Sequence, residues 1–181
     1  MLKKIAILLV ILGFLFILML LTTGESHFSV QSEVHYSASP EALWLKLENV
    51  DRWPDWWPGM EEAKLVGALR TGSEIHIRLK GMPSADRASL VLERPPYELV
   101  WEGSGIFGSR AGTRVNIEPD TLGSHMSMEN FVVGPQAFLA RFTGEDAFVK
   151  YQQALLDNFG ISLGGPSSSG EKSIESALPV D

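Results

Sequence analysis

The feature that most constrains this chain is an uninterrupted apolar run near its N-terminus. Every residue between Ile5 and Leu21 is aliphatic, Phe, Met, Ala or Gly. As a helix the run would extend about 26 Å, close to the thickness of the hydrocarbon core of a bilayer. A core helix of a soluble domain would carry polar residues along one face, and this run carries none. The sequence therefore predicts an N-terminal transmembrane helix within residues 1–23.

The charges that flank this run predict its orientation. Lys3 and Lys4 precede it, whereas the short linker 24–27 that follows contains no Lys or Arg. Because positive charge favours the cytoplasmic side, we expect a cytoplasmic N-terminus and an extracytoplasmic domain, either periplasmic or at the cell surface. A cleaved signal peptide is the alternative, although its apolar region is normally shorter.

Composition limits what the remaining chain can be. About 140 residues precede a polar tail, which is the size of one domain with its own core. The absence of cysteine excludes disulfides, cysteine-based zinc sites, thiol catalysis and lipid attachment to cysteine. After Lys3 and Lys4 the chain carries 13 basic and 22 acidic residues, a formal charge of −9. Such a surface repels phosphate backbones, so we expect no nucleic-acid partner.

The residue pattern predicts one domain over 28–163. Residues 28–38 alternate between apolar and polar side chains, as in a half-buried strand. Ser39, Pro40 and Glu41 then supply an N-cap, a first-turn proline and a first-turn acid, which predict a helix. Beyond a Trp-rich segment, alternation predicts six more strands at residues 63–66, 73–80, 87–93, 98–103, 112–118 and 124–132. Helical spacing returns after residue 135, breaks at Gly144 and resumes, and the Gly- and Ser-rich tail 164–181 is expected to be disordered.

Two blocks of sequence carry a resemblance to a known superfamily. The first is Ala38-Ser39-Pro40-Glu41-Ala42-Leu43-Trp44 with Val50-Asp51-Arg52-Trp53-Pro54-Asp55-Trp56-Trp57-Pro58, and the second is Pro96-Tyr97-Glu98-Leu99-Val100-Trp101-Glu102-Gly103 with Gly112-Thr113 and Glu129-Asn130-Phe131. They resemble the SRPBCC superfamily, which includes START lipid-transfer domains and the birch pollen allergen, and in particular its polyketide cyclase/dehydrase-like branch. The resemblance implies an α+β helix-grip fold, in which a curved antiparallel sheet of about seven strands wraps around a long C-terminal helix.

Such a fold implies an apolar cavity between the concave face of the sheet and the C-terminal helix, which is the default ligand site. Alternation and helical spacing predict inward-facing residues, and plain core packing is the alternative for each. Trp53, Trp56 and Trp57 have three interpretations: a lid, a core plug or a membrane-interface belt. Glu129 matches a recurring acid of the cyclase-like branch, and its alternative is a solvated strand residue. The cavity candidates are Tyr36, Trp53, Trp57, Ile77, Leu90, Trp101, Val115, Glu129, Phe148, Tyr151 and Leu155.

Three classes of function remain open. The sequence contains no nucleophile elbow, phosphate-binding loop, paired catalytic carboxylates or metal-ligand spacing, so we predict no catalytic residue, cofactor or metal. The leading hypothesis is a membrane-anchored protein that binds a hydrophobic small molecule or lipid. The alternative is a cyclase- or dehydratase-like enzyme that uses the same cavity, with Glu129 or Tyr36 as acid or base. The third is an interaction module of the cell envelope, whose contact surface is acidic or formed by the Trp cluster.

Overall fold

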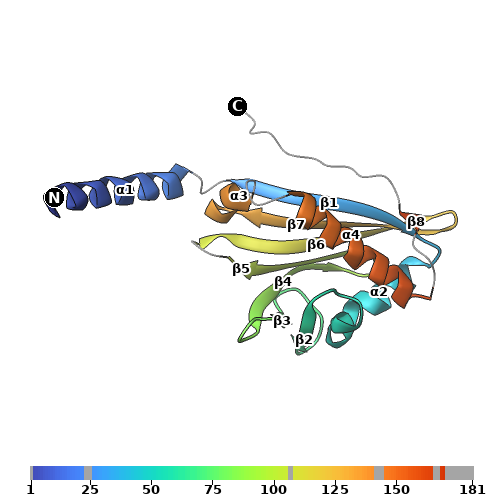
Figure 1. Cartoon of the computed structure of the whole chain (residues 1–181). Helices are drawn as coiled ribbons and strands as arrows, with labels where there is room; N and C mark the ends of the chain where they lie inside the picture. The colour runs from blue at the N-terminus through green and yellow to red at the C-terminus, as the bar shows by residue number, and fades with distance from the viewer. Residues whose placement is uncertain (1, 23–25, 106–107, 141–144, 165–167, 170–181) are drawn as a thin grey trace.

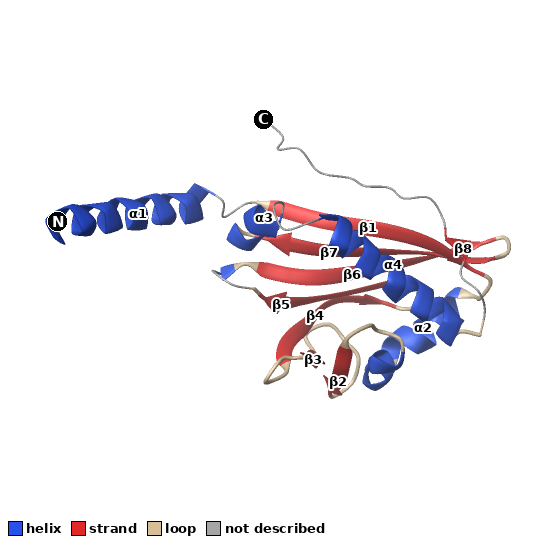
Figure 2. Cartoon of the chain, viewed as in Figure 1, coloured by secondary structure: helices blue, strands red, loops and turns tan. Residues whose placement is uncertain are grey.

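A computed structural model shows a curved antiparallel sheet with a long helix across its concave face (Figure 1; Figure 2). The structure describes residues 2–22, 26–105, 108–140, 145–164 and 168–169. The strand order is β2-β3-β4-β5-β6-β7-β1-β8. The elements are α1 Leu2–Thr22, β1 His27–Tyr36, α2 Pro40–Glu48, the 3-10 helix η1 Val50–Asp55, β2 Met60–Val66, β3 Glu74–Leu79, β4 Asp86–Arg94, β5 Glu98–Ser104, β6 Arg110–Asp120, β7 Gly123–Val133, α3 Pro135–Ala140, α4 Glu145–Ser162 and β8 Ser168–Ser169.

This arrangement confirms the expected α+β architecture, with strands β1 to β7 at the predicted places. β1 shows why the alternation was informative, because its buried residues include Val30, Val34 and Tyr36, two or four positions apart. It pairs with β7 along its whole length, from His27 opposite Val133 to Tyr36 opposite Ser124. The first and last long strands in the chain are therefore neighbours in the sheet.

The predicted start of α2 is also confirmed. The Ser39 side chain accepts a hydrogen bond from the backbone N–H of Ala42 at 3.4 Å, and Pro40 occupies the first turn. The buried face of the helix presents Leu43 and Leu47, neither of which is exposed, to the core. η1 follows directly and carries Trp53 into the same core.

A β-bulge between Leu90 and Leu92 changes one expected orientation. Leu90 lies opposite Trp101 and Leu92 lies opposite Val100, so two steps on β4 match one step on β5. Residues directly opposite each other share a face of the sheet. Leu92, which simple alternation places inside, therefore lies on the outer face with Val100.

The two ends of the chain were predicted to be a transmembrane helix and a disordered tail. α1 covers the segment predicted to span a membrane, and in Figure 1 it projects away from the sheet. Within the described residues, no helix is both long enough and apolar enough to cross a membrane. At the other end Ser168 and Ser169 pair with His35 and Val34 as the short strand β8, which the sequence did not predict. The rest of the predicted tail beyond Gly164 lies outside the described residues, as does the predicted break at Gly144, after which the helix resumes as α4 at Glu145.

Candidate ligand-binding cavity

A cavity of about 620 Å³ lies between the concave face of the sheet and α4. Its walls come from α3, α4, the strands β3 to β7 and the turn that leads into β2. Phe148 and Tyr151 line it while remaining 38% exposed each, so they border its opening together with the exposed lining residues Lys80, Asp86, Arg87 and Ser104. The lining residues are Trp57, Pro58, Gly59, Met60, Ile77, Leu79, Lys80, Asp86, Arg87, Ala88, Trp101, Gly103, Ser104, Ala111, Gly112, Thr113, Asn130, Phe131, Val132, Gln136, Phe148 and Tyr151.

The cavity exists because one cross-strand row of the sheet has small side chains. Ala88 lies opposite Gly103, and Gly103 lies opposite Ala111, on three successive strands. These residues leave space above the sheet that α4 does not fill. We call them the small-residue row.

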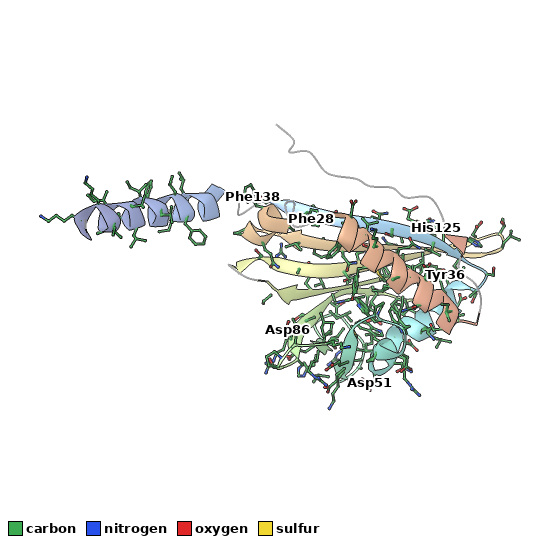
Figure 3. The ribbon with its side chains drawn as sticks, in the orientation of Figure 1. Phe28, Tyr36, Asp51, Asp86, His125 and Phe138 are labelled. Carbon is green, nitrogen blue, oxygen red and sulfur yellow. The ribbon has the colours of Figure 1, made fainter. Side chains whose placement is uncertain are left out.

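A second cross-strand row, nearer the other end of the strands, carries large side chains that leave no such space. There Leu99, Val115 and Met128 lie opposite one another on β5, β6 and β7, and none of them is exposed. Figure 3 shows the two ends of β1 that mark this division, with Phe28 near the start of α4 and Tyr36 near its end. Phe28 packs edge-on against Phe148 at a centroid distance of 6.4 Å, whereas Tyr36 packs against Phe159 at 5.6 Å.

The tryptophan cluster separates the filled half from the cavity. Trp53 has no exposed surface, lies 4.7 Å from Trp101 between ring centroids and donates Nε1 to the Leu47 carbonyl at 2.8 Å. Trp56 is 2% exposed and packs edge-on against Phe159. Trp53 and Trp56 are therefore core plugs, and their burial is incompatible with a membrane-interface belt. Trp57, stacked on Trp53, forms a wall of the cavity.

Trp57 is tied to α4 by its indole nitrogen. Its Nε1 donates to the Tyr151 hydroxyl at 2.8 Å, and that hydroxyl donates to the Pro58 carbonyl at 3.0 Å. Burial raises the pKa of Tyr151, and the bond from Trp57 offsets part of that increase. The Tyr151 hydroxyl is therefore neutral near pH 7 and serves as a hydrogen-bonding link across the mouth.

Thr113 and Asn130 form a polar pair on the sheet side of the cavity. They lie directly opposite each other on β6 and β7, and the Thr113 hydroxyl donates to Asn130 Oδ1 at 2.7 Å. Thr113 is 5% exposed and lies opposite Trp101 on its other side. Strand alternation indicates that both residues face inward, but the sequence alone does not show that they lie opposite each other.

Five of the predicted cavity residues line the cavity: Trp57, Ile77, Trp101, Phe148 and Tyr151. Five others are not among its lining residues. Four of these, Tyr36, Leu90, Val115 and Leu155, lie in the filled core, and Trp53 lies behind Trp57 and Trp101. The direction in which these side chains point was predicted correctly, but the division of the concave face into a filled and an open half was not.

Glu129 lies on the opposite face of the sheet. Its carboxylate pairs with Arg114 Nη1 at 3.2 Å, and Arg114 is its direct neighbour across β6 and β7. The inward phase of β7 is taken by Met126 and Met128, so Glu129 faces away from the cavity. The interpretation as a solvated strand residue is the correct one.

Tyr36 is equally unsuited to proton transfer in the cavity. Its hydroxyl donates to the Leu156 carbonyl at 2.8 Å in the core. Burial and, secondarily, the negative charge of Asp157 raise its pKa well above the ordinary value.

Among the residues that the structure describes, no group of three His, Asp or Glu side chains could hold a metal ion.

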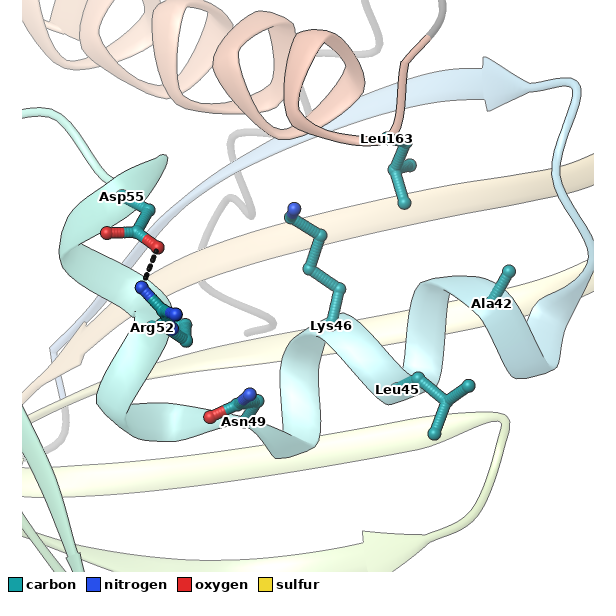
Figure 4. Close-up of a pocket in the computed structure, with 7 residues that line it drawn as sticks. All are labelled: Ala42, Leu45, Lys46, Asn49, Arg52, Asp55 and Leu163. Atoms are coloured by element: carbon teal, nitrogen blue, oxygen red, sulfur yellow. Dashed lines mark hydrogen bonds and ion pairs between the residues drawn. The ribbon is translucent and has the colours of Figure 1, made fainter.

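A second hollow of about 340 Å³ lies between α2, η1 and the end of α4 (Figure 4). Its charged groups are already paired, since Arg52 contacts Asp55 at 3.2 Å and Lys46 donates to the Ser162 carbonyl at 2.8 Å. This hollow lies outside the helix grip and offers no convergent polar groups to a ligand. The cavity under α4 is the better candidate site.

Comparison with known proteins identifies the family and the fold of this chain. Residues 27–160 match the family described as polyketide cyclase / dehydrase and lipid transport. Two Mycobacterium tuberculosis proteins that are named as toxins, from two strains, are each 26% identical to this chain over 100 residues, which is 53% of this chain and 69% of theirs.

Solved structures share the architecture at lower identity. A Rhodobacter sphaeroides protein superposes with a TM-score of 0.62 at 19% identity, over 75% of this chain and 91% of its own. The di-domain ARO/CYC BexL superposes with a TM-score of 0.60 at 16% identity, over 78% of this chain and 52% of its own. At these identities the superpositions support the fold alone. The family match, which covers β1 to β7 and most of α4, establishes that the chain belongs to the polyketide cyclase / dehydrase and lipid transport family of the SRPBCC superfamily.

Proposed function

We propose that the protein binds a hydrophobic small molecule or lipid in the cavity under α4. The observation that carries the proposal is the small-residue row, which leaves space beside the aromatic walls of Trp57 and Trp101. The volume of about 620 Å³ lies within the range of ordinary small-molecule sites. Apolar lining residues favour an apolar ligand because each contact removes apolar surface from water.

The family description also supports a cyclase or dehydratase reaction in the same cavity. Such a reaction needs an acid or base within reach of the ligand. Glu129 faces away from the cavity, and Tyr36 is engaged in the core. The ionisable residues of the lining, Lys80, Asp86, Arg87 and Tyr151, lie on the hairpin between β3 and β4 or at the mouth. This distribution favours binding over catalysis.

The binding proposal is tested by filling the cavity. Ala111→Leu adds a side chain to the small-residue row, and Ala154→Leu adds the same side chain to the exposed face of α4 as a matched control. The probe is hexanophenone, and binding is measured by calorimetry and by the change in tryptophan emission, to which Trp57 and Trp101 in the cavity wall contribute. We expect saturable binding by the wild type, at least tenfold weaker binding by Ala111→Leu and unchanged binding by Ala154→Leu. No binding by the wild type, or equal binding by all three proteins, would refute the proposal.

We further propose that α1 enters a membrane, either as a retained anchor that attaches the domain to it or as the apolar segment of a signal peptide that is cleaved after export. The large apolar side chains from Ile5 to Leu18 are 45–72% exposed, which is unfavourable in water and favourable in a bilayer. The continuous apolar run to Leu21 and the charges of Lys3 and Lys4 support an extracytoplasmic domain. The support for this proposal comes from the sequence and from the exposure of α1, because no helix among the described residues is both long enough and apolar enough to cross a membrane.

Fractionation tests this second proposal. The full chain should remain with membranes after alkaline extraction, and a chain that starts at Glu25 should not. Protease added to intact spheroplasts should digest the domain if it is extracytoplasmic. N-terminal sequencing of the mature protein distinguishes a retained anchor from a cleaved signal peptide. A full-length chain that is recovered in the soluble fraction with its N-terminus intact would contradict the proposal.

A further inference from the structure

The hydrogen-bonded pair Thr113–Asn130 lies on the sheet side of the cavity, beside the aromatic wall of Trp101. Three neighbouring residues of one cross-strand row contribute to the lining: Trp101, Thr113 and Asn130 on β5, β6 and β7. A polar pair in this position costs free energy unless its hydrogen-bonding groups find partners. The pair satisfies part of that requirement internally, through the Thr113 hydroxyl and Asn130 Oδ1.

The remaining capacity of the pair is chemically specific. The amide of Asn130 carries two N–H donors on Nδ2. Its oxygen accepts the Thr113 hydrogen, and no described residue accepts a hydrogen bond from Nδ2. The neighbouring strand residue on β1, Val30, offers no side-chain acceptor. Asn130 therefore presents two N–H donors without a partner among the described residues, whereas its oxygen already accepts one hydrogen bond.

We propose that Asn130 selects ligands that carry a hydrogen-bond acceptor, such as a ketone, ester or amide carbonyl, on an otherwise apolar body. This inference rests on the proposed ligand-binding function and adds a chemical class to it. The Thr113 hydroxyl holds the Asn130 amide by its oxygen, so the donors are held in place before the ligand binds. A bound carbonyl oxygen would accept from Nδ2, while Trp57, Trp101 and Ile77 contact the apolar body.

The experiment compares two probes that differ in one functional group, hexanophenone and hexylbenzene. Dissociation constants are measured for the wild type, Asn130→Leu and Asn116→Leu. Asn116 occupies β6 on the outer face of the sheet, opposite Glu98 and Ser127, so the same substitution there leaves the cavity unchanged. The ratio of the two dissociation constants removes any change of cavity volume that affects both probes equally. Comparing this ratio between the wild type and a variant also cancels the different hydrophobicity of the probes.

We expect Asn130→Leu to raise the dissociation constant of hexanophenone, relative to that of hexylbenzene, by about fivefold to tenfold, which is the effect of losing one hydrogen bond. Asn116→Leu should leave the ratio at its wild-type value. An unchanged ratio in Asn130→Leu would overturn the proposal while the ligand-binding function stands. Failure of both probes to bind the wild type would overturn both.

A measurement on the wild type keeps the test valid if Asn130→Leu does not fold. The infrared carbonyl band of bound hexanophenone should lie below its frequency in hexane, because a hydrogen bond from Nδ2 weakens the C=O bond. A band at the hexane frequency would show that no donor reaches the carbonyl and would overturn the proposal.

Discussion

The indole nitrogen of Trp57 and the hydroxyl of Tyr151 are joined by a hydrogen bond of 2.8 Å that links the turn before β2 to α4. Because Tyr151 also donates to the Pro58 carbonyl, one hydroxyl holds both sides of the cavity mouth together. A ligand that enters between them must separate these groups or pass beside them.

Tyr151→Phe should open the mouth more often without removing a wall of the cavity. The substitution leaves Trp57 Nε1 without its partner, which should lower the free energy of unfolding by about 1 kcal/mol. Stopped-flow fluorescence should show faster association and faster dissociation of hexanophenone, with a smaller change in the dissociation constant. Tyr97→Phe, at a tyrosine that is 50% exposed, is the control and should change neither rate. Unaltered rates in Tyr151→Phe would show that the link does not control entry.

Two leucines on the concave side should respond differently to truncation. Leu90 is 1% exposed within the filled core, so Leu90→Ala should cost about 2–5 kcal/mol in the free energy of unfolding. Leu79 borders the cavity and is only half-buried, so Leu79→Ala should cost less than half as much. Hexylbenzene binding should weaken in Leu79→Ala and remain unchanged in folded Leu90→Ala. Urea denaturation and calorimetry measure both quantities, and equal costs would contradict the division into two halves.

Tyr36 should make stability depend on alkaline pH. Its pKa is raised above the ordinary value of 10.0, so its stabilising contribution is complete below pH 10 and is lost as the pH rises toward the folded-state pKa. Tyr36→Phe removes this dependence and also the hydrogen bond to the Leu156 carbonyl. The variant should be less stable than the wild type by about 1 kcal/mol at pH 8.

The difference between these two proteins should shrink and then change sign above pH 10. Urea denaturation at a series of pH values measures it. The other tyrosines are common to both proteins and cancel in the comparison. A difference that stays constant through pH 11 would show that Tyr36 ionises normally in the folded state.

Glu129→Gln should have little effect. The ion pair with Arg114 lies on the outer face, and exposed pairs contribute at most about 1 kcal/mol. The free energy of unfolding should therefore fall by no more than that amount, and hexanophenone affinity should not change. A large loss of affinity or of any turnover would reinstate Glu129 as a functional residue.

Local patterns predicted the fold because the periodicities of side chains depend on near neighbours. The alternation of β1 and the cap at Ser39 are both satisfied within a few residues, and both appear in the structure. The bulge at Leu90 was not predictable in this way, because it depends on how β4 pairs with β5. The strand β8 likewise depends on a partner, Val34 and His35, that lies far away in the sequence.

The sequence predicted which side chains face inward, but not which of them line the cavity. Trp101 and Val115 have the same inward phase, yet only Trp101 borders the cavity. The difference arises from cross-strand registers, which place Trp101 next to the small-residue row and Val115 in a filled row. Thr113 and Asn130 were passed over because each is unremarkable alone, and their meaning comes from lying opposite each other.

The small-residue row has a consequence for the length of ligand that the protein accepts. Its members stand on β4, β5 and β6, and neighbouring strands lie about 4.8 Å apart. Adding a side chain at Ala88, Gly103 or Ala111 would therefore block the cavity at three different depths, measured across the strands from β7. If the cavity binds a ligand as proposed, larger side chains at these three positions should shorten the longest molecule that fits by different amounts.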